Sequence, residues 1–148
     1  MASEFYSQFP LNLGGGDSAG EGPMDLLLDT LKLMLMDTHT ADQTGDAVKA
    51  DLPAEESSGS GYTAGGATLA NKTWATSSLT TTFDNTADVV WTISTTLDTN
   101  VGILWDDTPT SPADPLILAD SFGSQTVTGG DLTYTPHASG FGSITVAT

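Results

Sequence analysis

The chain has 148 residues, no cysteine, and 19 acidic residues against three lysines and no arginine, which gives a formal net charge of −16. This length is enough for one domain with its own core. The charge excludes a nucleic-acid-binding protein, because Lys32, Lys49 and Lys72 are too few to neutralise phosphates, and it disfavours docking on anionic membranes. Without cysteine there are no disulfides and no thiolate chemistry.

The N-terminal region predicts an arm, helical or extended, over residues 1–23. Phe5, Phe9 and Leu13 share one helical face, so residues 3–13 predict a short helix, or half of one cut at Pro10. Glycines dominate residues 14–23 and predict a flexible loop. We therefore expect this arm to contribute little to the fold. The sequence "MASEFYSQFP" lacks the basic and apolar regions of a signal peptide, which predicts a soluble protein made in a cytoplasm.

Residues 24–37 carry two competing patterns. Leucine and methionine favour a helix, but Leu31, Leu33 and Leu35 alternate with their neighbours as in a strand covered on both faces. We expect a strand over residues 30–36. The polar stretch that follows predicts one turn of helix near residues 47–52.

From residue 67 onward the sequence predicts strands throughout, in segments rich in Val, Ile, Thr and aromatic residues. These segments are "ATLANKTWA", "SLTTTFD", "DVVWTIS", "VGILWDD", "PLILADSF", "DLTYTP" and "SITVA", separated by the turn signals "DNTAD", "DTN", "DTPTSPADP", "TGGD" and "PHASGFG". Short strands at regular spacing predict a mainly β domain over residues 24–148. We expect an antiparallel β-sandwich or a jelly-roll-like barrel.

The glycine-rich stretch "SSGSGYTAGGAT" raises the question of phosphate binding. A P-loop needs a lysine after its second glycine, and a dinucleotide fingerprint needs a strand before it and a helix after it. Neither context is present. We therefore expect Gly65 and Gly66 to provide positive φ angles or a close backbone approach, and Tyr62 to anchor the loop against the sheet.

Other candidate sites are weaker. Ser18 lies in "GDSAG", which matches a nucleophile elbow but lacks its strand and helix, and His39 and His137 occupy turn-like segments. The adjacent pairs Glu55–Glu56 and Asp106–Asp107 are expected to be exposed. Residues 37–46 carry oxygen ligands without the EF-hand pattern, so a solvated loop is favoured over calcium. We expect no catalytic, cofactor-binding or metal-ligating residues.

The three tryptophans lie on expected strands. Trp74, Trp91 and Trp105 are expected to pack in the core, with Trp91 especially buried because it ends the apolar run "DVVW". A sugar-binding platform is the alternative role for these side chains.

Several segments, in one order along the chain, resemble a family of small virion structural proteins of tailed bacteriophages. They are "DLLLDTLKLMLMDTHT", the run Ser-Gly-x-Gly-Tyr-Thr-Ala-Gly-Gly at residues 58–66, "DVVWT" and "VGILWDDTPTSPADPLILADSFGS". In the last segment Ser121 is inserted between Asp120 and Phe122. The resemblance covers most of the chain from about residue 25 and implies a structural protein of the particle, without catalytic residues.

The expected function is therefore a capsid decoration or cement protein on the outer surface of a virion. Its expected partners are the major capsid protein or other virion proteins, with self-association into a homo-oligomer, and neither nucleic acid nor membrane. One alternative is a neck or tail protein that binds a host glycan in the manner of an adhesin. Another is a small hydrolase built on Ser18, which a Ser18→Ala variant tests.

Overall fold

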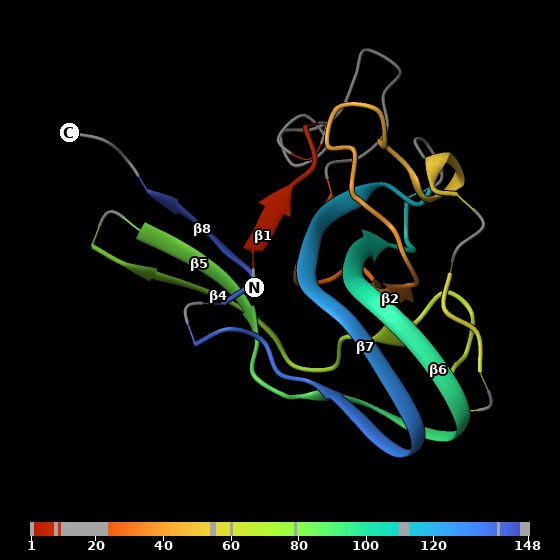
Figure 1. Ribbon diagram of the computed structural model, residues 1–148. Helices are drawn as coiled ribbons and strands as arrows, with labels where there is room; N and C mark the ends of the chain where they lie inside the picture. Colours follow the sequence, from red (N-terminus) through yellow and green to blue (C-terminus); the bar gives the residue numbers. More distant parts are fainter. Residues whose placement is uncertain are drawn as a thin grey trace.

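The computed structural model shows a mainly β, antiparallel protein (Figure 1). It describes residues 2–7, 9, 24–53, 56–59, 61–78, 80–109, 113–138 and 140–145. The described strands are β1 (Ala2–Phe5), β2 (Leu31–Met36), β3 (Ala67–Thr68), β4 (Lys72–Ser77), β5 (Thr80–Asn85), β6 (Val89–Asp106), β7 (Leu116–Tyr134) and β8 (Gly142–Thr145), with a short 3-10 helix at Lys49–Asp51.

The strands form two antiparallel sheets. The first has five strands in the order β1-β7-β6-β2-β3, and the second has three in the order β4-β5-β8. In Figure 1 the second sheet lies to one side of the first, and the long strands β6 and β7 run between them. One hydrophobic cluster includes side chains of both sheets, among them Leu33 of β2 and Phe83 of β5. The two sheets therefore share a core.

Strands β6 and β7 form the longest ladder, which pairs Val89 with Tyr134 at one end and Trp105 with Leu116 at the other. Its register shifts between Ile93 and Thr96, and again between Thr99 and Val101. The second shift leaves residues 122–124 of β7 outside the ladder. Such bulges bend and twist a strand pair, and here the pair curves as it passes from one sheet to the other (Figure 1).

Two expectations about local structure are confirmed. Residues 31–36 are a strand, because Leu31, Leu33 and Leu35 on one face and Met34 and Met36 on the other are all buried. The turn expected near residues 47–52 is the 3-10 helix. Among the described residues, no helix is long and apolar enough to cross a membrane.

The extended alternative for the N-terminal arm is confirmed at residues 2–5, whereas the expected helix is wrong there, and so is the expectation that the arm contributes little to the fold. Residues 2–5 are a strand, not a helix, and pair with residues 118–121 of β7. Tyr6 is completely buried and Phe9 belongs to the main core, so the described part of the arm, residues 2–7 and 9, is part of the fold. Phe5 and Phe9 still stack, with ring centroids 5.0 Å apart, although Phe5 lies in a strand. Residues 10–23, with their expected loop, lie outside the described residues.

Two expected turns are also wrong. The "DTN" segment (98–100) lies inside β6 and the "TGGD" segment (128–131) lies inside β7. Gly129 and Gly130 do adopt positive φ angles, of 68° and 107°. The chain uses their conformational freedom beside a register shift and does not reverse there. The expected loops at 107–115 and 136–142 do separate strands.

We predict that Tyr6→Ala lowers the free energy of unfolding by about 3–5 kcal/mol, the usual cost of truncating a buried aromatic side chain. Its neighbour Ser7 is exposed, so Ser7→Ala is the matched control and should change stability by less than about 0.5 kcal/mol. Urea denaturation followed by tryptophan fluorescence measures both. Equal midpoints for the two variants would show that the N-terminal residues do not contribute to the core.

Candidate functional site

The glycine-rich loop is fixed to the sheet by its own carboxylate and tyrosine. The Tyr62 hydroxyl donates a hydrogen bond to Glu56 Oε1 (2.8 Å) and accepts one from the Leu35 backbone N–H (2.9 Å). The Gly65 N–H also donates to Glu56 Oε1, and Trp105 Nε1 donates to the Gly65 carbonyl oxygen at 3.1 Å. The predicted role of Tyr62 is confirmed. In a phosphate-binding loop, backbone N–H groups of this kind would bind the anion. Here the N–H of Gly65 donates to the Glu56 carboxylate of the protein itself.

Three glycines of this loop have positive φ angles, and two touch neighbouring backbone. Gly61, Gly65 and Gly66 have φ angles of 99°, 88° and 81°. A Cβ atom on Gly61 would lie 1.9 Å from the Thr92 carbonyl oxygen, and one on Gly66 would lie 2.0 Å from that of Leu33. The expectation for Gly65 and Gly66 is therefore confirmed. The loop needs glycine here because its backbone lies directly against strands β2 and β6.

We predict that Gly66→Ala destabilises the protein far more than Gly129→Ala does. Both positions have positive φ, which costs an alanine roughly 1–2 kcal/mol, but a Cβ on Gly129 meets no atom within 4 Å. Gly66→Ala must also displace the β2 backbone. Thermal unfolding followed by circular dichroism measures the two variants, and similar losses of melting temperature would contradict the close-approach explanation.

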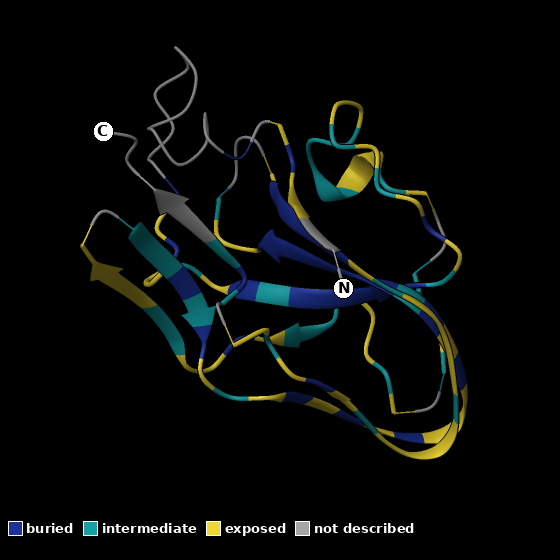
Figure 2. Ribbon diagram, turned by 60° about the vertical axis from the view of Figure 1, so that its left-hand side comes forward, coloured by how far each residue is buried: buried dark blue, intermediate teal, exposed yellow. Residues whose placement is uncertain are grey.

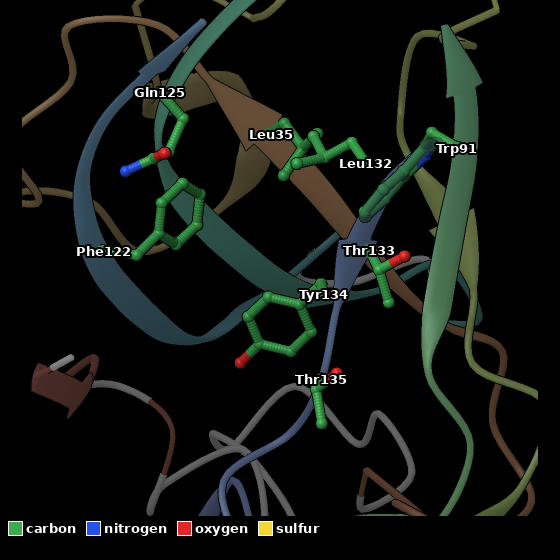
Figure 3. Close-up of a pocket in the computed structure, with 8 residues that line it drawn as sticks. All are labelled: Leu35, Trp91, Phe122, Gln125, Leu132, Thr133, Tyr134 and Thr135. Carbon is green, nitrogen blue, oxygen red and sulfur yellow. The ribbon is translucent and has the colours of Figure 1, made fainter. Parts of the chain in front are cut away.

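An apolar groove of about 320 Å³ lies inside the curve of β7 (Figure 3). Leu35, Trp91, Phe122, Leu132 and Tyr134 line it. Gln125, Thr133 and Thr135 add polar groups to the lining. Figure 3 shows side chains from two separate parts of β7, around Phe122 and around Leu132, and from Thr135 just after its end, about the same space. The bulge at 122–124 makes this possible, and no sequence pattern marked Phe122, Gln125 or Leu132 in advance.

Two of the aromatic side chains that line the groove, Trp91 and Tyr134, are mostly buried in the core. Trp91 and Tyr134 are 5% and 7% exposed. The Tyr134 hydroxyl donates to Asp120 Oδ2 at 2.6 Å, and burial, followed by this hydrogen bond, raises the pKa of Tyr134. The groove therefore offers a ligand mainly the edges of rings and the partly exposed Phe122 and Leu132 side chains.

The tryptophans divide between core and surface. The predicted burial of Trp91 is confirmed, and Trp105 is 1% exposed with Lys49 Nζ 4.1 Å from its ring centroid. The core expectation is wrong in part for Trp74, which is 36% exposed on β4 while it packs against Phe83.

The carboxylates expected to be exposed differ in their surroundings. Asp107 is exposed and pairs with Lys32 at 2.6 Å. Asp106 is completely buried, because it ends the inward-facing part of β6, so that expectation is wrong for Asp106. Burial, and to a smaller extent the nearby Asp29, raise its pKa to about 7, against the lowering effect of the Thr108 N–H bond.

Glu56 is also not exposed, since it holds the glycine loop; Glu55 lies outside the described residues.

We predict that the free energy of unfolding falls as the pH rises from about 4 to about 7. The folded-state pKa of Asp106 lies near 7 and an unfolded aspartate has a pKa of about 3.9. Between these values the folded state binds a proton that the unfolded state does not, so raising the pH favours unfolding until the folded carboxyl has ionised.

Asp106→Asn should remove this part of the pH dependence, whereas Asp107→Asn, the exposed neighbour, should keep it. Urea titrations at about pH 5, 6, 7 and 8 measure the three proteins, in the range where most other carboxylates are already ionised. Parallel pH profiles for the wild type and Asp106→Asn would contradict the assignment to Asp106.

In the oxygen-rich segment 37–46, aspartate oxygens accept hydrogen bonds from other groups of the same segment. Asp42 Oδ1 accepts hydrogen bonds from the N–H groups of Gly45 (3.0 Å) and Thr44 (3.1 Å) and from the Thr44 hydroxyl (2.9 Å), which lower the pKa of Asp42. His39 is buried, with Nε2 3.6 Å from Asp46 Oδ2. Within the described ranges, no group of three acidic or histidine side chains is arranged to hold a metal ion.

The remaining sequence candidates are not brought together in the described part of the chain. A polar hollow of about 310 Å³ is lined by Asp37, Glu56 and Asp98, but the Glu56 carboxylate binds Tyr62 and that of Asp98 accepts the Thr126 hydroxyl. His137 lies in the loop after β7. Ser18 lies outside the described residues.

No protein-family model, curated protein or solved structure matches this chain.

Proposed function

We propose that this protein is a non-enzymatic structural protein of a bacteriophage virion, a decoration or cement protein on the outside of the capsid. The observation that carries the proposal is the structural role of residues 58–66, the most distinctive segment of the resemblance to virion proteins. The described residues of this segment attach a loop to β2 and β6 through Tyr62, Gly65 and Gly66, and they form no reaction centre. A segment that builds the fold fits a structural role.

We infer further that the two sheets are the layers of a β-sandwich of the kind found in many particle proteins. The shared core supports this inference, because Leu33 and Leu35 of the larger sheet and Phe83 of the smaller one belong to the same cluster. Aromatic contacts continue it, with Phe83 and Phe141 rings 5.7 Å apart and Phe141 and Tyr134 rings 6.0 Å apart. Residues 24–148 would form this domain, with β1 added to its sheet.

The charge supports a place on the outer surface. A net charge of −16 repels packaged DNA, so a position inside the capsid is unfavourable. The same charge keeps an outer layer soluble. Attachment then has to overcome repulsion between acidic neighbours, and we infer that apolar and backbone contacts provide it. Phe5 is 37% exposed and fits that role, whereas Phe9 is buried and does not.

We predict that low salt releases the protein from particles. Charge repulsion is screened beyond about 10 Å at 0.1 M salt and reaches further when salt is removed, while apolar burial is unchanged. Particles dialysed into low salt without divalent ions should therefore lose this protein and melt at a lower temperature. Quantitative gel analysis of sedimented particles measures the loss. Release at high salt with retention at low salt would instead show that charge pairing with a basic partner holds it.

The second candidate is a neck or tail protein that binds a host glycan. The apolar groove favours it, since the partly exposed Phe122 and Leu132 and the polar Gln125 together give a ligand an apolar surface with a hydrogen-bonding group beside it. Copy number separates the two functions. A decoration protein occurs in numbers comparable with the major capsid protein, and a neck or tail protein in a small fixed number per particle, which quantitative mass spectrometry of purified virions distinguishes. Absence of the chain from purified virions would refute both.

A further inference from the structure

The acidic residues are distributed unevenly over the chain. No Asp or Glu occurs from Ser57 to Phe83, nor from Leu132 to the C-terminus at Thr148, although the chain has 19 in all. These two stretches supply most of the three-stranded sheet. Strands β4, β5 and β8 together contain one acidic residue, Asp84, and one basic residue, Lys72. This sheet is therefore neutral within a protein of charge −16.

Strand β4 is an edge of this neutral sheet and has none of the usual features that protect an edge. It lies at the end of the order β4-β5-β8, and its pairing with β5 continues without a bulge from Lys72 to Ser77. It contains no proline, and its single charge lies at its first residue. From residue 74 to residue 77 it is exposed, and it lies at the margin of the molecule (Figure 2). An edge of this kind pairs readily with another strand.

The hairpin geometry identifies the backbone groups that face outward. Ser77 and Thr80 flank a two-residue connection, so they form a hydrogen-bonded pair, and bonded and non-bonded pairs then alternate along the ladder. Lys72, Trp74 and Thr76 fall at the non-bonded positions. Their N–H and C=O groups therefore point away from β5, to the open side of β4.

Exposed aromatic surface lies beside this edge. Trp74 is 36% exposed and Phe5 is 37% exposed, and both line a narrow apolar hollow together with Phe83 and Gly142. A strand added to β4 would lie beside Trp74, on the side of β4 away from Phe83 and Gly142. An uncharged strand fits best beside Trp74, because β4 itself carries no acidic or basic side chain from Thr73 to Ser77.

Strand β4 is complementary to itself. In an antiparallel pair of two β4 strands with Trp74 opposite Trp74, Lys72 of one copy faces Thr76 of the other, and Thr73 faces Ala75. No like charges face each other. The outward groups of Trp74 then form the central hydrogen-bonded pair, and both indole rings lie on one face of the combined sheet. All the acidic residues that would repel a second copy lie outside β4.

We propose that β4 is a self-association edge, through which two copies of this chain pair antiparallel about a twofold axis at Trp74 and form a continuous six-stranded sheet. The proposal does not rest on a place in the virion, because the pairing uses only this chain. Dimers held in this way form against the mutual repulsion of two charges of −16. The association constant therefore rises with salt concentration, as screening weakens the repulsion while the edge contacts remain.

Sedimentation equilibrium of the full chain tests the proposal over a range of protein and salt concentrations. The wild type should show a monomer–dimer equilibrium that shifts towards dimer as NaCl is added. Thr76→Pro removes an outward N–H from both edges of the dimer without a change in charge and should lower the association constant by about tenfold or more. Thr76→Val keeps the N–H group and the β-branched shape, so it should associate as the wild type does.

Cysteine cross-linking tests the register and remains decisive if Thr76→Pro fails to fold. The chain has no cysteine, so each variant carries a single thiol. Trp74→Cys places two thiols across the proposed axis and should form a disulfide-linked dimer under mild oxidation. Ser124→Cys, exposed on β7 and away from the edge, should stay largely monomeric. A wild type that is monomeric at every salt concentration, or equal cross-linking of the two variants, would overturn the proposal.

Discussion

The ladder between β6 and β7 is the contact on which the rest of the fold depends. At the end where Trp105 pairs with Leu116 it forms the middle of the five-stranded sheet, with β2 added on one side and β1 on the other. At the end where Val89 pairs with Tyr134 it leads directly into β5 and β8. The bend between these ends brings the two sheets onto one core. Without this pairing the two sheets would not share a core.

The glycine loop depends on that ladder in turn. Trp105 on β6 donates its indole N–H to Gly65, and Gly61 lies against the backbone of β6 at Thr92. Glu56 completes the attachment because its carboxylate binds both Tyr62 and Gly65. This loop resembles ligand-binding loops in composition, but here it is attached to strands β2 and β6 and contributes to the fold. Its hydrogen-bonding groups are used within the protein.

Charge divides the surface in a way that composition alone does not reveal. Most of the chain repels other copies and other acidic surfaces, whereas the sheet β4-β5-β8 is neutral and has an open edge. Repulsion between the acidic parts of two copies disfavours contacts there, whereas the proposed contact through the neutral edge meets less repulsion. The same separation would suit the proposed decoration layer, in which acidic neighbours lie side by side and short-range contacts hold them in place.

Some of the local structure was predictable because it depends on neighbours in sequence. The alternation of Leu31, Leu33 and Leu35 indicated a buried strand, and the absence of a lysine after the glycines of residues 57–66 argued against a phosphate loop. The burial of Asp106 was not predictable, since it depends on the neighbours that β6 acquires in the sheet. The groove was not predictable either, because a bulge in β7 brings Phe122 near Leu132.

The sequence by itself determined the β class and the strong negative charge, because these follow from composition and from short-range patterns. Only the tertiary structure decided how the turn signals were used. Gly129 and Gly130 had the conformational freedom for a chain reversal, but pairing with β6 kept them within one long strand. Residues 2–5 became a strand for the same reason, since the edge of β7 offered hydrogen bonds that outweighed a weak local preference for helix.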